Sequence, residues 1–174
     1  MKPFKTEVPF ETPWFSVIAK TLREDEDPWY SLRLPDYAAV VATTVEGRAV
    51  LVRQYRPAVE TVTLELPSGL VDPGESPVEA ARRELREETG YDAPSIELLG
   101  PLLPDTGRLG NRIWCCVAAG IQRVPDWIPE AGVEVVEMAV ADLPAAVADG
   151  RFDHALHVAA LMLAQVRGKW LPGV

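Results

Sequence analysis

Short apolar runs, each closed by charged or turn-forming residues, recur along the chain and predict β-strands. The first two runs, residues 14–22 and 29–34, flank a charged turn at residues 23–28 and predict an N-terminal β-hairpin. Val- and Ala-rich runs at 37–45 and 48–55 follow, and Glu46 and Gly47 between them suit a tight turn. Further strands are predicted, in chain order, at residues 62–66, 95–103, 112–121 and 133–140.

Residues 76–89 carry the start and stop signals of an α-helix. Ser76 can cap the helix, Pro77 suits its first position, and Glu79 completes a capping box. Gly90 is the residue type expected just beyond a helix C-terminus. The segment is therefore predicted to be a well-defined helix in the middle of the chain.

Two more helices are predicted at residues 142–149 and 153–167, where Gly150 and Gly168 would end them. The last helix has an apolar face that we expect to be buried, formed by Leu156, Ala159, Ala160 and Leu163. Because strands outnumber helices, we predict an α/β (α+β) fold: a mixed β-sheet sandwiched between helices (α/β/α), with the N-terminal β-hairpin added.

Composition restricts the class of protein. The chain has 174 residues and a formal net charge of −9, which argues against nucleic-acid partners because these require clustered Lys and Arg. The N-terminal residues lack the apolar core of a signal peptide, and no apolar run approaches the roughly 20 residues that span a bilayer. The only cysteines, Cys115 and Cys116, are adjacent, so we expect two reduced residues on a strand, one of them in the core. These observations favour a cytoplasmic protein without a membrane partner.

The predicted central helix also carries candidate chemistry. Glu84, Glu87 and Glu88 stand at positions i, i+3 and i+4, so their side chains share one helix face. Several carboxylate oxygens on one ridge suit a hard cation such as Mg²⁺ or Mn²⁺. Such a face is more often simply solvated, and these three residues alone do not separate the two interpretations.

The spacing around this ridge is far more specific. Gly69 is followed by five residues, Glu75, seven residues, and then Arg83-Glu84-Leu85-Arg86-Glu87-Glu88-Thr89-Gly90-Tyr91. All seven fixed polar or glycine positions of the Nudix box are present, which a random window would match on the order of once in 10⁸. The chain therefore resembles the Nudix hydrolases. Tyr91 departs from the pattern only in being aromatic where the family usually carries an aliphatic residue.

The resemblance implies roles for the residues of the box. Glu87 and Glu88 would be direct metal ligands together with the Gly69 carbonyl, and Glu84 would be a further ligand or a supporting acid. Arg83 would orient the glutamates by ion pairing, and Glu75 would shape the loop and hold Arg83. The implied cofactor is Mg²⁺ or Mn²⁺, which would neutralise a diphosphate and activate a water molecule.

A general base is also implied. In the ADP-ribose branch of the family this base is usually a Glu on a loop before a late strand, and Glu130 is the best match here. The loop is marked by Pro129 and Gly132, so it could move over a bound substrate. Glu134 is the competitor, although strand alternation could simply place it in solvent.

Substrate-binding candidates lie outside the box. Arg56 could grip a diphosphate bidentately, or it could pair on the surface with Glu60 or Glu65. The other candidates are Glu65, Arg108 and Trp29, with Tyr30 as an alternative to Trp29 for stacking on a base. Trp114 is expected in the core, and His154 and His157 are expected to be ordinary helix residues because hard cations prefer oxygen.

Residues 51–56 and 64–69 resemble the corresponding segments of ADP-ribose and nucleotide-sugar pyrophosphatases. The implied function is hydrolysis of a diphosphate bond in a nucleoside diphosphate linked to another moiety. The loop at residues 103–108 lacks the Ser-Pro-Gly of many ADP-ribose enzymes and has Arg108, with Arg112 close after it. This favours a substrate with more negative charge or a different sugar, and the sequence leaves the base and sugar open.

The resemblance also divides the chain. Residues 1–36 would add N-terminal strands that form part of a homodimer interface, and residues 37–174 would be the hydrolase domain. Two alternatives remain open: a house-cleaning nucleoside triphosphate pyrophosphatase, against which the extra N-terminal strands count, and a non-catalytic binding module with the same fold. Such modules usually break the glutamate cluster, which is intact here.

Overall fold

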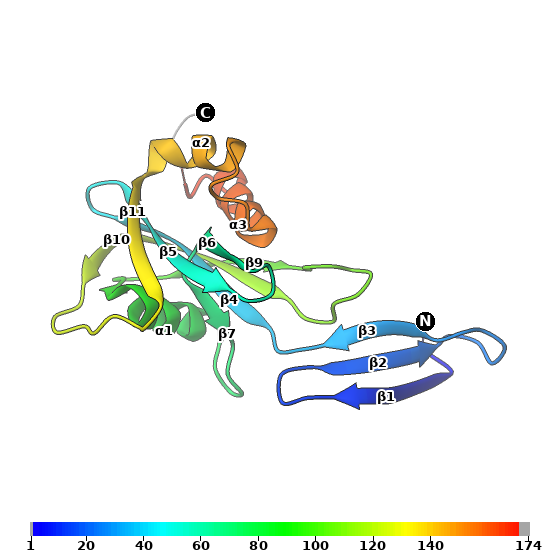
Figure 1. The fold of residues 1–174 in the computed structure, drawn as a ribbon. Coiled ribbons are helices and arrows are strands. Elements are labelled where there is room, and N and C mark those ends of the chain that lie inside the picture. The colour runs from blue at the N-terminus through cyan, green and yellow to red at the C-terminus, as the bar shows by residue number, and fades with distance from the viewer. Residues whose placement is uncertain (1, 171–174) are drawn as a thin grey trace.

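The computed structural model describes residues 2–170. The chain begins with a three-stranded antiparallel sheet that projects from the rest of the molecule (Figure 1). Its strands are β1 (Lys5–Glu11), β2 (Ser16–Thr21) and β3 (Trp29–Arg33). The predicted hairpin is therefore incomplete, because β1 adds an edge strand. Pro9 and a register shift between Glu7 and Phe10 break the alternation of β1, and both features are typical of edge strands.

The body contains a second, mixed sheet. Its strands are β4 (Tyr37–Thr44), β5 (Arg48–Arg56), β6 (Thr61–Glu65), β7 (Ser68–Leu70), β8 (Tyr91–Asp92), β9 (Glu97–Leu102), β10 (Ile113–Arg123) and β11 (Val133–Ala139). The central path runs β11-β5-β4-β10-β8, with β6 paired to β5, β7 to β4 and β9 to β10. β4 and β10 are parallel, whereas the other pairs are antiparallel. The short strands β7 and β8 were not predicted.

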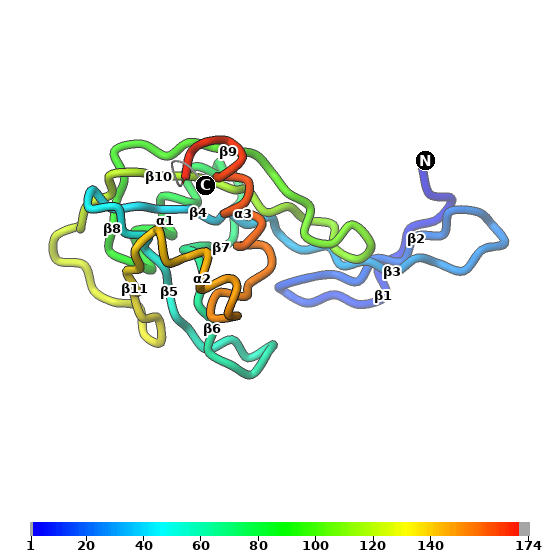
Figure 2. The backbone as a smooth tube through the Cα atoms, turned by 90° about the horizontal axis from the view of Figure 1, so that it is seen from above, coloured from blue at the N-terminus to red at the C-terminus, as the bar shows by residue number. Residues whose placement is uncertain are grey.

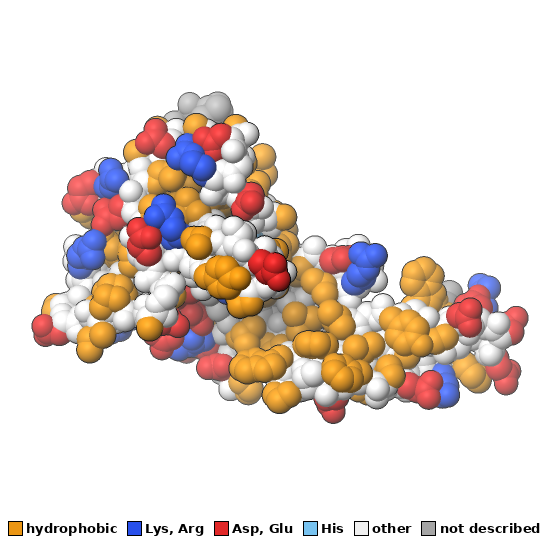
Figure 3. Space-filling view, in the orientation of Figure 1, with side chains coloured by type: hydrophobic (Ala, Val, Ile, Leu, Met, Phe, Trp, Pro, Cys, Tyr) orange, Lys and Arg blue, Asp and Glu red, His pale blue; other side chains and the backbone are white. Residues whose placement is uncertain are grey.

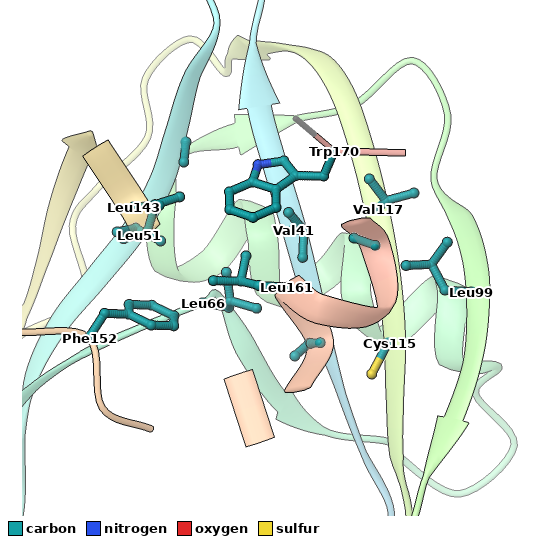
Figure 4. Close-up of a cluster of buried hydrophobic side chains, with 14 of the residues drawn as sticks. Val41, Leu51, Leu66, Leu99, Cys115, Val117, Leu143, Phe152, Leu161 and Trp170 are labelled. Atoms are coloured by element: carbon teal, nitrogen blue, oxygen red, sulfur yellow. The ribbon is translucent and has the colours of Figure 1, made fainter. Parts of the chain in front are cut away.

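Helices cover both faces of this sheet, as predicted (Figure 1). One face packs on α1 (Pro77–Thr89), and the other on α2 (Leu143–Ala148) and α3 (Ala155–Val166), with the short 3₁₀ helix η1 (Val140–Asp142) before α2. Figure 4 shows the second of these cores, where Phe152, Leu161 and Trp170 meet side chains of the sheet.

The two-sided covering corrects the prediction for the cysteines. Cys115 lies in the core beneath α2 and α3, and Cys116 lies in the core beneath α1. Both are buried and both are free thiols within the described chain. Neighbouring strand residues point to opposite faces, and here both faces are covered. The expectation that only one cysteine is buried was therefore wrong.

Helix α1 begins and ends as its sequence predicts. The Ser76 hydroxyl accepts a hydrogen bond from the Glu79 N–H, and the Glu79 carboxylate accepts one from the Ser76 N–H. Gly90 adopts the left-handed conformation at φ 67° and closes the helix. Ala80, Ala81 and Leu85 are buried against the sheet, and Glu88 of the acidic ridge is buried as well. Only Glu87 of the ridge has a largely exposed side chain.

The buried face of α3 is displaced from the predicted one. The fully buried residues are His157, Ala160, Leu161 and Ala164. Leu156 and Leu163 are only partly buried at the margin of the same core. The helix is apolar almost all round, so its periodicity alone did not fix its orientation. Among the described helices, none has the length and apolar character needed to cross a membrane.

Candidate active site

The acidic ridge of α1 lies against the backbone of β7. The Ser68 N–H donates a hydrogen bond of 2.9 Å to Glu88 Oε2. At Gly69, a Cβ atom would overlap the carboxylate of Glu84, so only glycine allows this approach. Two carboxylates from α1 therefore meet a strand backbone whose carbonyl groups can add further oxygen ligands. Ser68 was not singled out from the sequence, because nothing in its spacing signals this contact.

Arg83 ties the ridge to the preceding loop. Its guanidinium donates to both oxygens of Glu75 at 3.0 Å, to Glu84 at 2.6 Å and to Glu87 at 3.3 Å. It also donates to the Leu70 carbonyl at 2.8 Å. Glu75 Oε2 in turn accepts the Asp72 N–H, which closes the loop onto the helix. The contacts expected of Arg83 and Glu75 are thus formed, and the Leu70 carbonyl is an unpredicted partner.

Three carboxylates on one ridge differ sharply in surroundings. Glu88 is 7% exposed, and burial together with the charges of Glu84 and Glu130 raises its pKa to about 8. Burial also raises the pKa of Glu84, whereas the side chain of Glu87 is exposed. Crowded, buried carboxylates of this kind are stabilised in their charged form by a cation. The carboxylate oxygens of Glu84, Glu87 and Glu88 are the ligand type that Mg²⁺ and Mn²⁺ prefer. Among the described residues their ligand atoms are not gathered within 4.8 Å of one another, as those of Glu65, His154 and His157 are.

Glu130 lies on the loop between β10 and β11. It lines the same hollow as Glu87, and its charge raises the pKa values of Glu84 and Glu88. Its competitor Glu134 lies on β11, where Arg53 pairs with it at 3.0 Å. The geometry therefore brings Glu130 to the acidic ridge and leaves Glu134 on the exposed face of a strand.

Arg56 pairs with Glu65, which is one of the two interpretations that the sequence left open. Its Nε and one terminal nitrogen donate to the two oxygens of Glu65 at 2.8 and 2.6 Å, and the Thr63 hydroxyl adds a bond of 2.6 Å. Burial disfavours the charged form of Glu65, yet these donors outweigh it and lower the pKa to about 2. The guanidinium is only partly buried and lines a hollow with Thr61, Asp153 and His154.

Glu65 also belongs to a group with His154 and His157, whose potential ligand atoms lie within 4.8 Å of one another. This group is poorly suited to a metal. The Leu66 N–H donates to His157 Nδ1, which places the ring proton on Nε2, and Arg56 occupies both oxygens of Glu65. His157 is 1% exposed and fixes the segment that leads to Gly69. Sequence reasoning missed this structural role because Leu66 is 91 positions away.

Two substrate-binding candidates are not brought to the ridge within this chain. Arg108 has a highly exposed side chain 3.8 Å from Asp105, on a loop whose backbone bonds to Leu32 of β3. Trp29 is 67% exposed on the projecting sheet. Trp114, expected in the core, packs against the face under α1 and donates its indole N–H to Asp36.

Comparison with known proteins adds an independent finding. A family model described as NUDIX domain matches residues 33–161. The chain is 30% identical to the ADP compounds hydrolase NudE of Escherichia coli over 142 residues, which cover 78% of this chain and 72% of that protein. It is 44% identical to the ADP-ribose pyrophosphatase of Bacillus subtilis over 62 residues, which cover 36% of this chain and only 34% of that protein.

A solved structure is similar over nearly the whole chain. The crystal structure of an ADP compounds hydrolase superimposes with a TM-score of 0.80 at 26% identity, covering 97% of both chains. The projecting N-terminal sheet is therefore within the matched length, although the family model begins only at residue 33.

Proposed function

Because the chain belongs to the Nudix family, as its sequence predicted, we propose that it is a metal-dependent pyrophosphohydrolase. Its substrate is a nucleoside diphosphate linked to another moiety, of the ADP-ribose or nucleotide-sugar type. Hydrolysis of the diphosphate bond releases a nucleoside monophosphate and a phosphorylated partner. The observation that carries this proposal is the contact of the Glu84 and Glu88 carboxylates with the backbone of Ser68 and Gly69.

The cofactor in this proposal is Mg²⁺ or Mn²⁺, held by Glu84, Glu87, Glu88 and the Gly69 carbonyl. When bound, the cation supplies charge neutralisation for the diphosphate and lowers the pKa of a water molecule. Arg83 keeps Glu84 and Glu87 in place through its ion pairs, and Glu75 holds Arg83 from the other side.

Glu130 acts as the general base. The attacking water forms a new bond to phosphorus through its oxygen, its proton passes to the Glu130 carboxylate, and the bridging P–O bond breaks. The proximity of Glu130 to Glu84 and Glu88 supports this role.

Arg56 binds the substrate diphosphate, and Glu65 orients its guanidinium. The bidentate pair leaves one terminal nitrogen of Arg56 outside its hydrogen bonds to Glu65. A guanidinium held in one orientation loses little freedom when an anion binds, which favours affinity. Arg108 and Trp29 belong to this proposal only if a second copy of the chain brings them to the ridge.

The partner is a second copy of this chain. The projecting sheet exposes a set of large apolar side chains over its surface, visible in Figure 3, and soluble monomers rarely expose so many together. They are Phe4, Val8, Phe10, Trp14, Trp29 and Tyr30.

The proposal also places the protein in the cytoplasm, since Cys115 and Cys116 stay reduced there.

A substrate panel tests the proposed function. Purified protein is assayed with Mg²⁺ and with Mn²⁺ on ADP-ribose, nucleotide sugars, dinucleotides and nucleoside triphosphates, with product phosphates identified by chromatography. We expect cleavage between the two phosphates of a nucleoside diphosphate derivative. Preferred cleavage of triphosphates would favour the house-cleaning alternative, and no cleavage of any compound would favour a binding module.

A further inference from the structure

The loop that carries Glu130 is attached to the body through one side chain. Among residues 125–132, all of which the structure describes, only Trp127 is partly buried, and the others are exposed. Its indole N–H makes the one side-chain hydrogen bond between this stretch and the rest of residues 2–170. The position of the loop relative to α1 therefore depends largely on Trp127.

Trp127 sits on the C-terminal end of α1. Its indole N–H donates to the Glu87 carbonyl at 3.0 Å, a group in the last turn that lacks a helical partner. Its ring lies on Gly90, where a Cβ atom would overlap the ring carbons. Just before the loop, the Val124 N–H donates to the Gly90 carbonyl at 2.7 Å. Gly90 therefore ends the helix and also leaves the space that the indole ring occupies.

Glu130 depends on this attachment for its position. Its side chain forms neither a hydrogen bond nor an ion pair with another described residue, and it lines one hollow with Glu87 and Trp127. Glu130 follows Trp127 by only three positions, so the anchored indole limits how far the Glu130 backbone can move from α1. Displacements of about 1 Å in a reacting group can lower a rate by about 10²-fold.

We propose that Trp127 is a positioning residue: its indole, seated on Gly90 and bonded to the Glu87 carbonyl, holds the loop so that Glu130 lies beside the acidic ridge. The inference rests on the proposed function in one respect, namely that Glu130 receives the proton of the attacking water. Trp127 thereby anchors the loop between β10 and β11. Gly90 is needed both to end α1 and to leave room for the indole ring.

A double-mutant cycle tests this inference with the full chain and the best substrate of the panel. Trp127→Ala is expected to lower kcat by roughly 10- to 100-fold, with KM and the half-saturating concentration of Mg²⁺ changed by less than about threefold. Trp127→Phe, which keeps the ring on Gly90 but loses the N–H, should recover most of the rate. Ile128→Ala alters an exposed neighbour on the same loop and is the matched control.

The cycle is closed by Glu130→Gln. If Trp127 acts through Glu130, adding Trp127→Ala to Glu130→Gln lowers kcat no further, because the group being positioned is already gone. Multiplied losses, or wild-type kcat in Trp127→Ala, would overturn the inference. Should Trp127→Ala fail to fold, the same cycle with Trp127→Leu decides the question by the same criterion.

A second measurement separates this inference from the proposed function. Limited proteolysis should cut within residues 124–132 faster in Trp127→Ala than in wild type or Ile128→Ala, whatever the substrate. If the wild type hydrolyses nothing yet the loop is cut faster, the proposed function fails and the anchor stands. Equal cutting rates in all three proteins would refute the anchor.

Discussion

Residues of the same type have different properties on α1 according to their surroundings. Glu87 and Glu88 are adjacent, yet the first is exposed and the second is buried beneath Ser68. Burial and neighbouring charges raise the pKa of Glu88 to about 8, so in the metal-free protein it is largely protonated at pH 7. The glutamates of the ridge therefore differ in exposure and in pKa.

Glu87 offers the cleanest test of the metal assignment. Glu87→Gln removes a charge from an exposed side chain, so the free energy of unfolding should hardly change. Activity should fall by at least about 10²-fold in kcat if the carboxylate holds the cation. Steady-state kinetics with Mg²⁺ and Mn²⁺ measures the loss of kcat, and a thermal unfolding curve measures the stability. Near-wild-type turnover would contradict the assignment.

His157 gives a prediction about pH. Burial lowers its pKa from 6.5 to about 3, so below pH 6.5 the unfolded chain binds a proton that the folded chain does not. His157 therefore costs stability as the pH falls from 6.5 toward 3. Glu88 acts oppositely, because its raised pKa makes the folded, metal-free protein bind a proton between about pH 8 and its unfolded value of 4.5.

Comparing the wild type with a variant at His157 isolates the contribution of this histidine to the pH dependence of stability. His157→Asn keeps an acceptor near the Leu66 N–H but removes the titrating ring. As the pH falls from 6 to 4.5, the free energy of unfolding of His157→Asn should rise relative to that of the wild type, by up to about 1.4 kcal/mol per pH unit. Urea unfolding at a series of pH values without metal measures this difference. Parallel profiles would show that His157 does not titrate as described.

At the scale of elements, α1 is defined by signals in its own sequence, whereas β7 is defined by its partner. The capping box at Ser76 and the left-handed Gly90 fix both ends of α1 locally. By contrast, residues 68–70 form a strand because they pair with Tyr37–Ala39 of β4. The candidate site forms where α1, whose ends are fixed by its own sequence, meets β7, which is a strand because it pairs with β4.

The N-cap of α1 gives a prediction at this scale. Ser76→Ala should lower the free energy of unfolding by about 1 kcal/mol, since the Glu79 N–H loses its acceptor. For a chain of this size the midpoint of thermal unfolding should fall by roughly 2–4 °C. Ser76→Asp keeps a capping oxygen and is the control, expected within a few tenths of a kcal/mol of wild type. Equal stability of the alanine and aspartate variants would contradict the capping role.

At the scale of the whole molecule, the chain is elongated. Figure 2 shows β1, β2 and β3 extending away from the body. The chain continues from β3 into β4 of the body, and the loop between β9 and β10 lies against β3. Every residue of β1 is exposed, which is an unstable arrangement for a sheet carrying Val8 and Phe10. A second copy of the chain covering this sheet would resolve it.

Oligomeric state tests the proposed dimer. Phe10→Glu places a charge among the exposed aromatic side chains, where Phe10 lies 6.2 Å from Phe15 between ring centres. Sedimentation velocity should find wild type as a dimer and the variant shifted toward the monomer, because burying an unpaired carboxylate is costly. Val166→Ser, at an exposed apolar site on α3, is the control and should stay dimeric. A monomeric wild type at micromolar concentration would refute the proposal.

Prediction from the sequence succeeded where the signal is local. The main strands, α1 with both its ends, and the layered fold all follow from periodicity, caps and turn residues. It failed for the strands β1, β7 and β8, for the buried face of α3 and for the second cysteine. In each case the outcome depends on what the segment pairs with or packs against, and the sequence of a single segment does not specify its neighbours.

The candidate site divides in the same way. The spacing from Gly69 to Gly90 by itself determined the family. It also predicted that the glutamates proposed as ligands share one face, because a helix brings positions i, i+3 and i+4 together. Only the tertiary structure decided that Glu88 is buried, that Arg56 is held by Glu65, and that Trp127 seats on Gly90. Those contacts join residues far apart in the chain, and their burial and charge are set by the packing that brings them together.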